Sequence, residues 1–148
     1  MKLFGVGTDI VQISRFKKNL NNNNLLKRLF SKSEITNCRS KINAKNCFAK
    51  RFAAKEAFSK ALGTGISKGI SFNEIIVLNE KSGKPFIRLI GDTKKITEKK
   101  FKKKKYKISV SLSDEKNYAL AFVTISWTKK KNYLNFYLKI FKLCCLHY

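Results

Sequence analysis

Acidic side chains are scarce in this 148-residue chain, which has 9 Asp+Glu against 33 Lys+Arg and a formal net charge of +24. A field of that sign attracts polyanions, which include nucleic acid, anionic lipid, phosphorylated metabolites and acidic proteins. Lysine, asparagine, isoleucine and phenylalanine are all abundant, as an AT-rich genome would make them. Coding bias therefore competes with electrostatics as the origin of the charge, and the charge alone identifies no partner.

Histidine and cysteine are too few and too far apart for a structural zinc site. The only histidine is His147, and none of Cys38, Cys47, Cys144 and Cys145 forms a CxxC pair. The adjacent pair near the end of the chain is a poor start for a disulfide framework. The first residues carry glycines and an aspartate where a secretory signal has its apolar core, so we expect a reducing cytoplasm.

Long hydrophobic runs are also missing. Residues 127–148 are basic and aromatic, and their apolar runs are too short and too broken by lysine to span a bilayer. We therefore expect no membrane span. A hydrophobic content of 43% favours one domain, over residues 1–126, followed by an extension over 127–148. That extension is expected to dock on the domain as an amphipathic helix, with disorder as the alternative.

The patterns that are present favour an α+β domain. A strand-like start is followed by short helices, a long helix and then strands, which predicts a small single domain with an antiparallel meander sheet packed against the long helix. Ser31 and Glu34 match a capping box at the start of one short helix. We expect strands over 2–13, 71–80, 85–90, 106–112 and 118–126, and helices over 14–20, 25–30 and about 44–62. Residues 92–105 are expected to be either a basic helix or a partly solvated arm.

The long helix contains "RFAAKEAFSK", in which a carboxylate falls among small residues. At 3.6 residues per turn, Glu56 lies on the alanine-rich side expected to pack, and Lys60 lies one turn further along. Arg51 and Lys55 are expected to point away from that side. Taken alone, Glu56 and Lys60 are also explained as a surface ion pair of the favoured i,i+4 order.

A second unexpected carboxylate, Asp9, lies in the apolar strand "GVGTDIV". It needs a cation, a hydrogen-bond donor or solvent there, although a strand-end cap would also explain it. Asp9 and Glu56 together are able to share a divalent ion such as Mg²⁺, which proteins hold with one or two carboxylates plus waters and phosphates. Lys60 and the glycine-rich loop 63–69 would then meet phosphate oxygens. No Walker loop and no G-x-G-x-x-G after a strand is present.

Four motifs in one order resemble those of the holo-acyl-carrier-protein synthases, which belong to the 4′-phosphopantetheinyl transferases. They are "GVGTDIVQISRF", "KRFAAKEAFSKALGTGI", "GKP" and "VSLSDEKNYALA", and the resemblance runs from about Leu3 to about Ile125. It implies transfer of 4′-phosphopantetheine from coenzyme A to a serine of apo acyl carrier protein, with release of adenosine 3′,5′-bisphosphate, in support of fatty acid biosynthesis. It also implies a homotrimer with active sites at subunit interfaces.

The resemblance assigns roles to individual residues. Asp9 and Glu56 match the family's metal ligands for Mg²⁺, with Mn²⁺ as the alternative, and Lys60 matches the lysine near the diphosphate; these three are the implied catalytic residues. Arg15 matches the arginine that docks the carrier protein. The coenzyme A contacts are expected at Arg51, Phe52, Gly63, Gly65, Gly83, Lys84 and Pro85, the last three reaching it from a neighbouring subunit.

Two departures and two rival functions accompany the resemblance. Ser109 stands where many relatives carry a histidine, and residues 127–148 have no counterpart in the short family members.

The first rival is a basic nucleic-acid-binding module that uses the lysines of 99–105, although it leaves Asp9 and Glu56 unexplained. The second is a relative that binds carrier protein without turnover. We expect no nucleic-acid partner. The base for the serine is either a water on the metal or a carboxylate acting through water.

Overall fold

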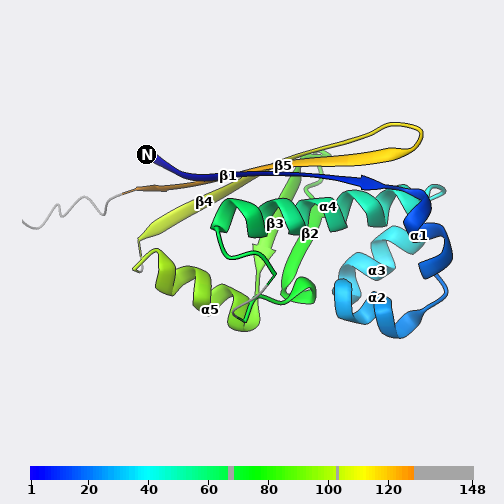
Figure 1. Ribbon diagram of the computed structural model, residues 1–148, viewed down its shortest axis with the longest axis horizontal. Coiled ribbons are helices and arrows are strands. Elements are labelled where there is room, and N and C mark those ends of the chain that lie inside the picture. The colour runs from blue at the N-terminus through cyan, green and yellow to red at the C-terminus, as the bar shows by residue number, and fades with distance from the viewer. Residues whose placement is uncertain (67–68, 103, 129–148) are drawn as a thin grey trace, which may run out of the picture.

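The computed structural model describes residues 1–66, 69–102 and 104–128 (Figure 1). It confirms the predicted α+β class with a long central helix. The predicted extension lies outside the described residues from position 129, and strand β5 continues two residues past the predicted boundary at 126. The elements are β1 Lys2–Gln12, α1 Ser14–Asn19, α2 Asn23–Leu29, α3 Lys32–Arg39, α4 Ala44–Leu62, the 3₁₀ helix η1 Phe72–Glu74, β2 Ile75–Asn79, β3 Pro85–Leu89, α5 Gly91–Lys100, β4 Lys105–Asp114 and β5 Tyr118–Thr128.

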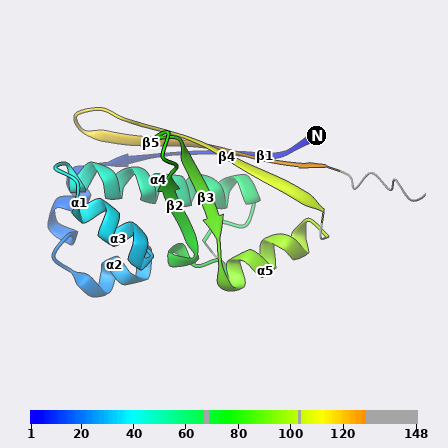
Figure 2. The same cartoon turned by 180° about the vertical axis from the view of Figure 1, so that it is seen from behind.

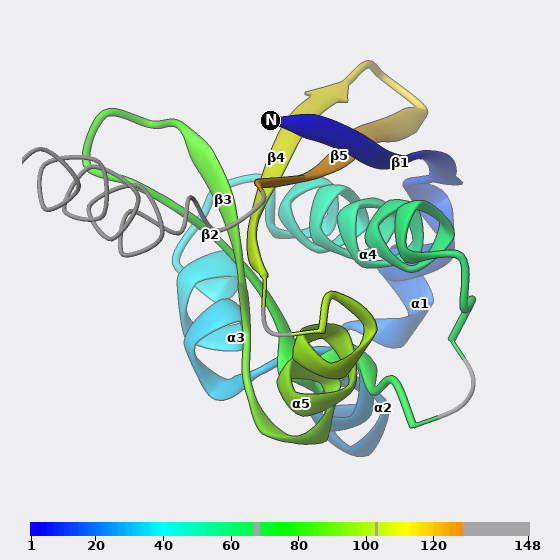
Figure 3. The same ribbon diagram turned by 90° about the vertical axis from the view of Figure 1, so that its left-hand side faces the viewer.

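The antiparallel strands divide between two sheets. One has three strands in the order β1-β5-β4, and the other is the β2–β3 hairpin. Helix α4 runs along one face of the three-stranded sheet, and the β2–β3 hairpin lies beside the helix, with β3 next to β4 (Figures 1, 2 and 3). Helices α1, α2 and α3 gather at one end of α4, and α5 lies toward the other end. The long helix is therefore enclosed on more than one side.

Glycines allow β1 to lie directly against α4. A Cβ atom on Gly7 would overlap the carbonyl oxygen of Ala57, and one on Gly5 would overlap that of Ala61. Ala57 and Ala61 are themselves buried, at 0% and 4% exposure. The prediction that these glycines permit close approach is confirmed, because any larger residue would push the strand away from the helix.

The side of α4 that faces away from β1 is also buried, which corrects the sequence interpretation. Arg51 and Lys55 do point away from the alanine-rich side, but they are 4% and 0% exposed because helices α1 to α3 and strand β2 cover that side. Lys55 Nζ lies 2.9 Å from the Glu34 carboxylate, and neither side chain is exposed. The predicted capping box of Ser31 and Glu34 is present, and Glu34 also accepts from the backbone N–H of Val77 at 3.0 Å.

Cys38 and Cys47 form a disulfide that joins α3 to α4. The spacing of the cysteines in the sequence did not predict this pair, because neither belongs to a CxxC motif. Among the described residues, no helix is long and apolar enough to cross a membrane.

Candidate active site

The site begins where β1 passes over α4. Asp9 pairs with Ala121 of β5 in the sheet register and lies on the same face of β1 as Gly7, the face that packs on the helix. The close approach at Gly7 therefore brings the Asp9 carboxylate toward α4. Its side chain is only 16% exposed, so it needs a nearby cation or donor.

Lys60 supplies that cation from α4. Its Nζ atom donates to Asp9 Oδ1 at 2.8 Å and to the backbone carbonyl oxygen of Thr8 at 3.0 Å. The Lys60 side chain is 52% exposed, so the ammonium group stays accessible to a ligand from solvent. The positive charge is thus fixed over Asp9 by two acceptors on β1. This contact joins residues that are 51 positions apart in the chain.

Glu56 lies one helical turn before Lys60 and completes the cluster. The side chain is half-buried, so it stands at the edge of the packed side of α4 rather than within it. Burial raises the pKa of the Glu56 carboxyl, the negative charge of Asp9 raises it further, and the positive charge of Lys60 lowers it. The negative charge of Asp9 thus acts on Glu56 across the contact between β1 and α4.

The three side chains fit a divalent ion with phosphate ligands. Among the described residues, no group of three His, Cys, Asp or Glu side chains is able to hold a metal. Two carboxylates are sufficient for Mg²⁺ when waters and substrate phosphates fill the remaining positions. A cation between Asp9 and Glu56 would relieve their repulsion, and the Lys60 ammonium group lies next to Asp9.

The glycine-rich loop follows directly from the end of α4. Gly63 has φ 73° and its N–H donates to the carbonyl oxygens of Ser59 and Lys60, which ends the helix in a left-handed cap. Gly65 has φ 60°, and nothing lies within 4 Å of the position a Cβ would take. Both glycines are exposed, one turn beyond Lys60, so their backbone is open to a ligand at this end of the helix.

Two further predicted residues are packed inside the molecule. The Arg51 guanidinium donates to Asn37 Oδ1 at 2.9 Å and to Asn79 Oδ1 at 3.2 Å, so it is directed toward α3 and β2. Phe52 is half-buried, and its ring centroid lies 5.6 Å from that of Phe16 and 5.2 Å from that of Phe72.

The remaining predicted residues lie apart from the cluster. Gly83 and Lys84 are exposed and Pro85 is half-buried, at the β2–β3 turn that projects away from α4 (Figure 3). Arg15 is exposed in α1, just after β1. One chain thus brings together Asp9, Glu56, Lys60 and the loop after α4, whereas the 83–85 turn presents its residues outward.

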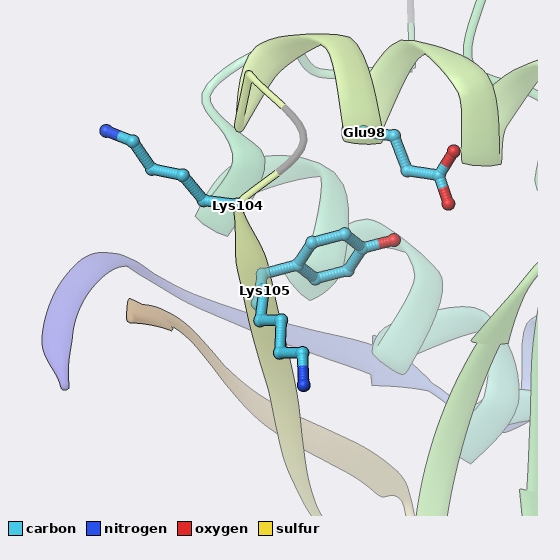
Figure 4. A pocket seen from close by; sticks show the side chains of 4 residues that line it. Glu98, Lys104 and Lys105 are labelled. Carbon is cyan, nitrogen blue, oxygen red and sulfur yellow. The ribbon is translucent and has the colours of Figure 1, made fainter. Parts of the chain in front are cut away.

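A hollow of about 670 Å³ lies at the junction of α5 and β4 (Figure 4). It is lined by Glu98, Lys104, Lys105 and Tyr106. The Lys104 and Lys105 side chains extend away from Glu98 and from each other, so their charges do not converge on one point. Lys104 instead lies over the ring of Trp127, 4.2 Å from its centroid. This hollow lacks the paired carboxylates of the cluster on α4.

Sequence reasoning missed the groups that hold the predicted residues in place. The carbonyl oxygen of Thr8 fixes Lys60, but a backbone acceptor leaves no mark in a sequence. Asn37 and Asn79 bind Arg51, and both are common residues outside any motif. The capping box did single out Glu34, yet its pairing with Lys55 depends on how α3 meets α4.

The chain matches known proteins over most of its length. Residues 5–123 match the family model of the 4′-phosphopantetheinyl transferase superfamily. The holo-[acyl-carrier-protein] synthase of Pelagibacter ubique is 46% identical over 84% of this chain and 98% of its own. The crystal structure of the synthase from Neisseria meningitidis superposes with a TM-score of 0.75 at 34% identity, over 84% of this chain and 98% of that one. The crystal structure of the Helicobacter pylori synthase in complex with coenzyme A superposes with a TM-score of 0.68 at 33% identity, over 82% of this chain and 99% of that one.

Proposed function

The chain belongs to the 4′-phosphopantetheinyl transferase superfamily, among the holo-[acyl-carrier-protein] synthases, and we propose that Asp9, Glu56 and Lys60 form its catalytic centre. As a member of this family, it transfers the 4′-phosphopantetheine group of coenzyme A to a serine of apo acyl carrier protein. The other product is adenosine 3′,5′-bisphosphate, and the reaction supports fatty acid biosynthesis. The observation that carries the proposed centre is the contact of Lys60 with Asp9 beside Glu56.

Lys60 and the loop after α4 bind the diphosphate of coenzyme A. The ammonium group is exposed while two acceptors on β1 fix its position, so it meets phosphate oxygens without first being ordered. Gly65 leaves room for the backbone to approach the same oxygens, since nothing lies within 4 Å of the position that its Cβ would take. Positive charge at this point stabilises the negative charge that develops on the departing bisphosphate.

Asp9 and Glu56 would hold a divalent ion, Mg²⁺ or Mn²⁺. A bound divalent ion would supply positive charge that offsets the negative charge developing on the diphosphate. The carboxylates come from separate elements, β1 and α4, whose relative position is set by the close contact at Gly7. The raised pKa of Glu56 is consistent with this role because a cation would replace the repulsion from Asp9 by attraction.

Arg15 of α1 binds the carrier protein. The arginine is exposed in α1, which follows the strand that carries Asp9, and the net charge of +24 attracts an acidic partner. The association rate should fall as ionic strength rises. An Arg15→Glu variant should bind the carrier protein more weakly while its affinity for coenzyme A is unchanged.

A homotrimer, expected from the resemblance, is supported by the outer face of the three-stranded sheet. This face turns away from α4 and carries four large apolar residues. In a single chain, each of them is between 41% and 62% exposed. A second copy of the chain is the proposed cover, because the 83–85 turn also projects outward, as it must to reach a neighbouring site (Figure 3). The four residues are Val6, Ile10, Leu120 and Phe122.

The cytoplasm is the proposed location. The sequence carries no cysteine framework typical of secreted domains, since Cys38–Cys47 is the one disulfide among the described residues. In a reducing compartment these two residues would be thiols. Thiol titration of protein isolated under conditions that block exchange would report which form the cell maintains.

The proposed function is tested by the intact mass of apo acyl carrier protein after incubation with this protein, coenzyme A and Mg²⁺. The expected result is a gain of one phosphopantetheine group that a chelator prevents and that added Mg²⁺ restores. No gain from a folded protein that still binds coenzyme A would identify a relative without turnover. The nucleic-acid alternative is set aside, because the family match covers residues 5–123 and includes both carboxylates.

A further inference from the structure

We propose that Asn79 is a positioning residue that fixes the outward turn Gly83–Pro85 to the buried guanidinium of Arg51. The inference rests on the proposed function, in which this turn contacts coenzyme A. It adds a residue that belongs to none of the motifs from which that function was inferred. Asn79 is the last residue of β2 and pairs with Pro85 in the hairpin register, so it stands where the two strands part to form the turn.

Both ends of the Asn79 amide are engaged. Its Oδ1 atom accepts from Arg51 Nη2 at 3.2 Å, and its Nδ2 atom donates to the carbonyl oxygen of Gly83 at 2.7 Å. A guanidinium only donates and a carbonyl only accepts, so the amide has one orientation that satisfies both partners. The side chain therefore transmits the position of Arg51 to the turn.

Arg51 is a fixed anchor. It is 4% exposed and also donates to Asn37 Oδ1 at 2.9 Å and to the carbonyl oxygen of Cys47 at 3.4 Å. Burial lowers the pKa of the guanidinium, and the charge of Glu34 opposes that shift. A buried charge that lost these acceptors would be costly, so the guanidinium stays where α3 and α4 place it.

The turn itself fixes its own shape but not its direction. Within it, the Gly83 N–H donates to the Glu80 carbonyl oxygen at 2.9 Å, and the Glu80 N–H donates to that of Lys84 at 2.9 Å. Gly83 has φ 88°, which a glycine adopts without strain. Residues 80–84 are exposed, so the body of the protein gives the turn little packing. Asn79 is the side chain through which α4 orients it.

An aspartate at position 79 separates the two contacts of the amide. Asn79→Asp keeps an oxygen for Arg51, and the added charge strengthens that contact. It has no N–H for the Gly83 carbonyl, and the second carboxylate oxygen repels that carbonyl instead. The anchor and the hairpin register are thereby retained while the link to the turn is lost.

Asn73→Asp is the matched control. Asn73 is exposed in η1, and its Nδ2 atom donates to the Lys27 carbonyl oxygen at 3.5 Å. The control makes the same chemical change and the same change in net charge, away from the turn. Asn79→Ser is a second, neutral variant that is too short to contact both partners, and it serves if the aspartate variant does not fold.

The experiment measures steady-state transfer and amide hydrogen exchange on the full chain. Loss of one hydrogen bond with added repulsion corresponds to about a tenfold change. We expect Asn79→Asp to raise KM for coenzyme A about tenfold with kcat changed less than about twofold. Without coenzyme A, amide exchange at Gly83 and Lys84 should rise by a similar factor. Asn73→Asp should match the wild type in each measurement.

Each outcome decides the proposal. A KM equal to that of Asn73→Asp, or turn amides that exchange at the wild-type rate, would overturn it. A fall in kcat with unchanged KM would also overturn it, because positioning of a binding turn acts on affinity. Wild-type protein without transferase activity would refute the proposed function, whereas the exchange measurement would still test the link between Asn79 and the turn.

Discussion

The ammonium group of Lys60 lies 2.8 Å from the carboxylate of Asp9, although 51 positions separate the two residues. The contact exists because Gly7 has no side chain, which allows β1 to pack directly on α4. It places a positive charge over Asp9 and beside Glu56 at the end of α4 that continues into the glycine-rich loop. The catalytic properties proposed for the protein follow from this one crossing of a strand and a helix.

Asp9→Asn and Glu56→Gln should each lower kcat for phosphopantetheine transfer by about a hundredfold or more, because each removes a charged metal ligand while keeping the shape of the side chain. Thermal unfolding should show that both variants keep their fold. The rate is measured over a range of Mg²⁺ concentrations. Asp114→Asn is the control, since Asp114 is a partly exposed carboxylate that pairs with Lys50 and not with Lys60. Full rates for both variants at low Mg²⁺ would contradict the metal assignment.

Lys60→Ala should be less harmful than either carboxylate change, because the metal would carry most of the neutralising charge at the diphosphate. We expect a fall in kcat/KM of about tenfold, the loss of one charge-assisted contact. Lys60→Arg should recover part of the loss, since the charge is kept. A greater loss for Lys60→Ala than for Glu56→Gln would assign the main electrostatic role to the lysine.

Lys55→Met should lower the free energy of unfolding by about 3–5 kcal/mol, because it leaves the Glu34 carboxylate buried without its cation. Urea denaturation measures the change. Lys50→Met is the control: Lys50 also pairs with a carboxylate, Asp114, but both side chains are partly exposed, so less than about 1 kcal/mol is expected. Equal losses of unfolding free energy in the two variants would show that burial does not increase the contribution of the Glu34–Lys55 pair to stability.

Active sites at subunit interfaces predict complementation between inactive variants. Glu56→Gln impairs the site on α4, and Lys84→Glu impairs the turn that would reach a neighbour's site. In trimers mixed at equal amounts, about a quarter of the sites combine an intact α4 with an intact turn. Co-refolded protein should therefore regain about a quarter of wild-type activity. No gain on mixing would place both residues in one subunit's site.

Cys38→Ser should lower stability only under oxidising conditions. A disulfide that closes a loop over a separation of 9 residues is worth about 2–3 kcal/mol by loop entropy. Chemical denaturation of the wild type and the variant, without and with a dithiol reductant, measures this. The difference should be present without reductant and shrink when it is added. A difference that persists in reductant would come from packing of the Cys38 side chain instead.

Much of the site was predictable because its signals are local or belong to a long motif. The α4 bounds predicted as about 44–62 agree with Ala44–Leu62, since apolar periodicity and a terminal glycine are properties of the segment itself. The same holds for the capping box of Ser31 and Glu34. Asp9 and Glu56 were singled out as carboxylates in apolar surroundings, and the motifs shared with the family assigned roles to them and to Lys60.

The sequence by itself thus predicted the class of fold and the bounds of α4, and it singled out the three residues of the proposed centre. The strand predicted over 71–80 is instead a 3₁₀ helix, Phe72–Glu74, followed by β2, Ile75–Asn79. Only the tertiary structure decided that Arg51 and Lys55 are buried, because a helical wheel identifies one packed side and α4 has two. It alone paired Cys38 with Cys47, and Arg51 with Asn79. Each of these contacts joins two elements that are distant in the sequence. Periodicity within one segment shows which of its sides is apolar, but it does not show which residue of another segment will lie against that side.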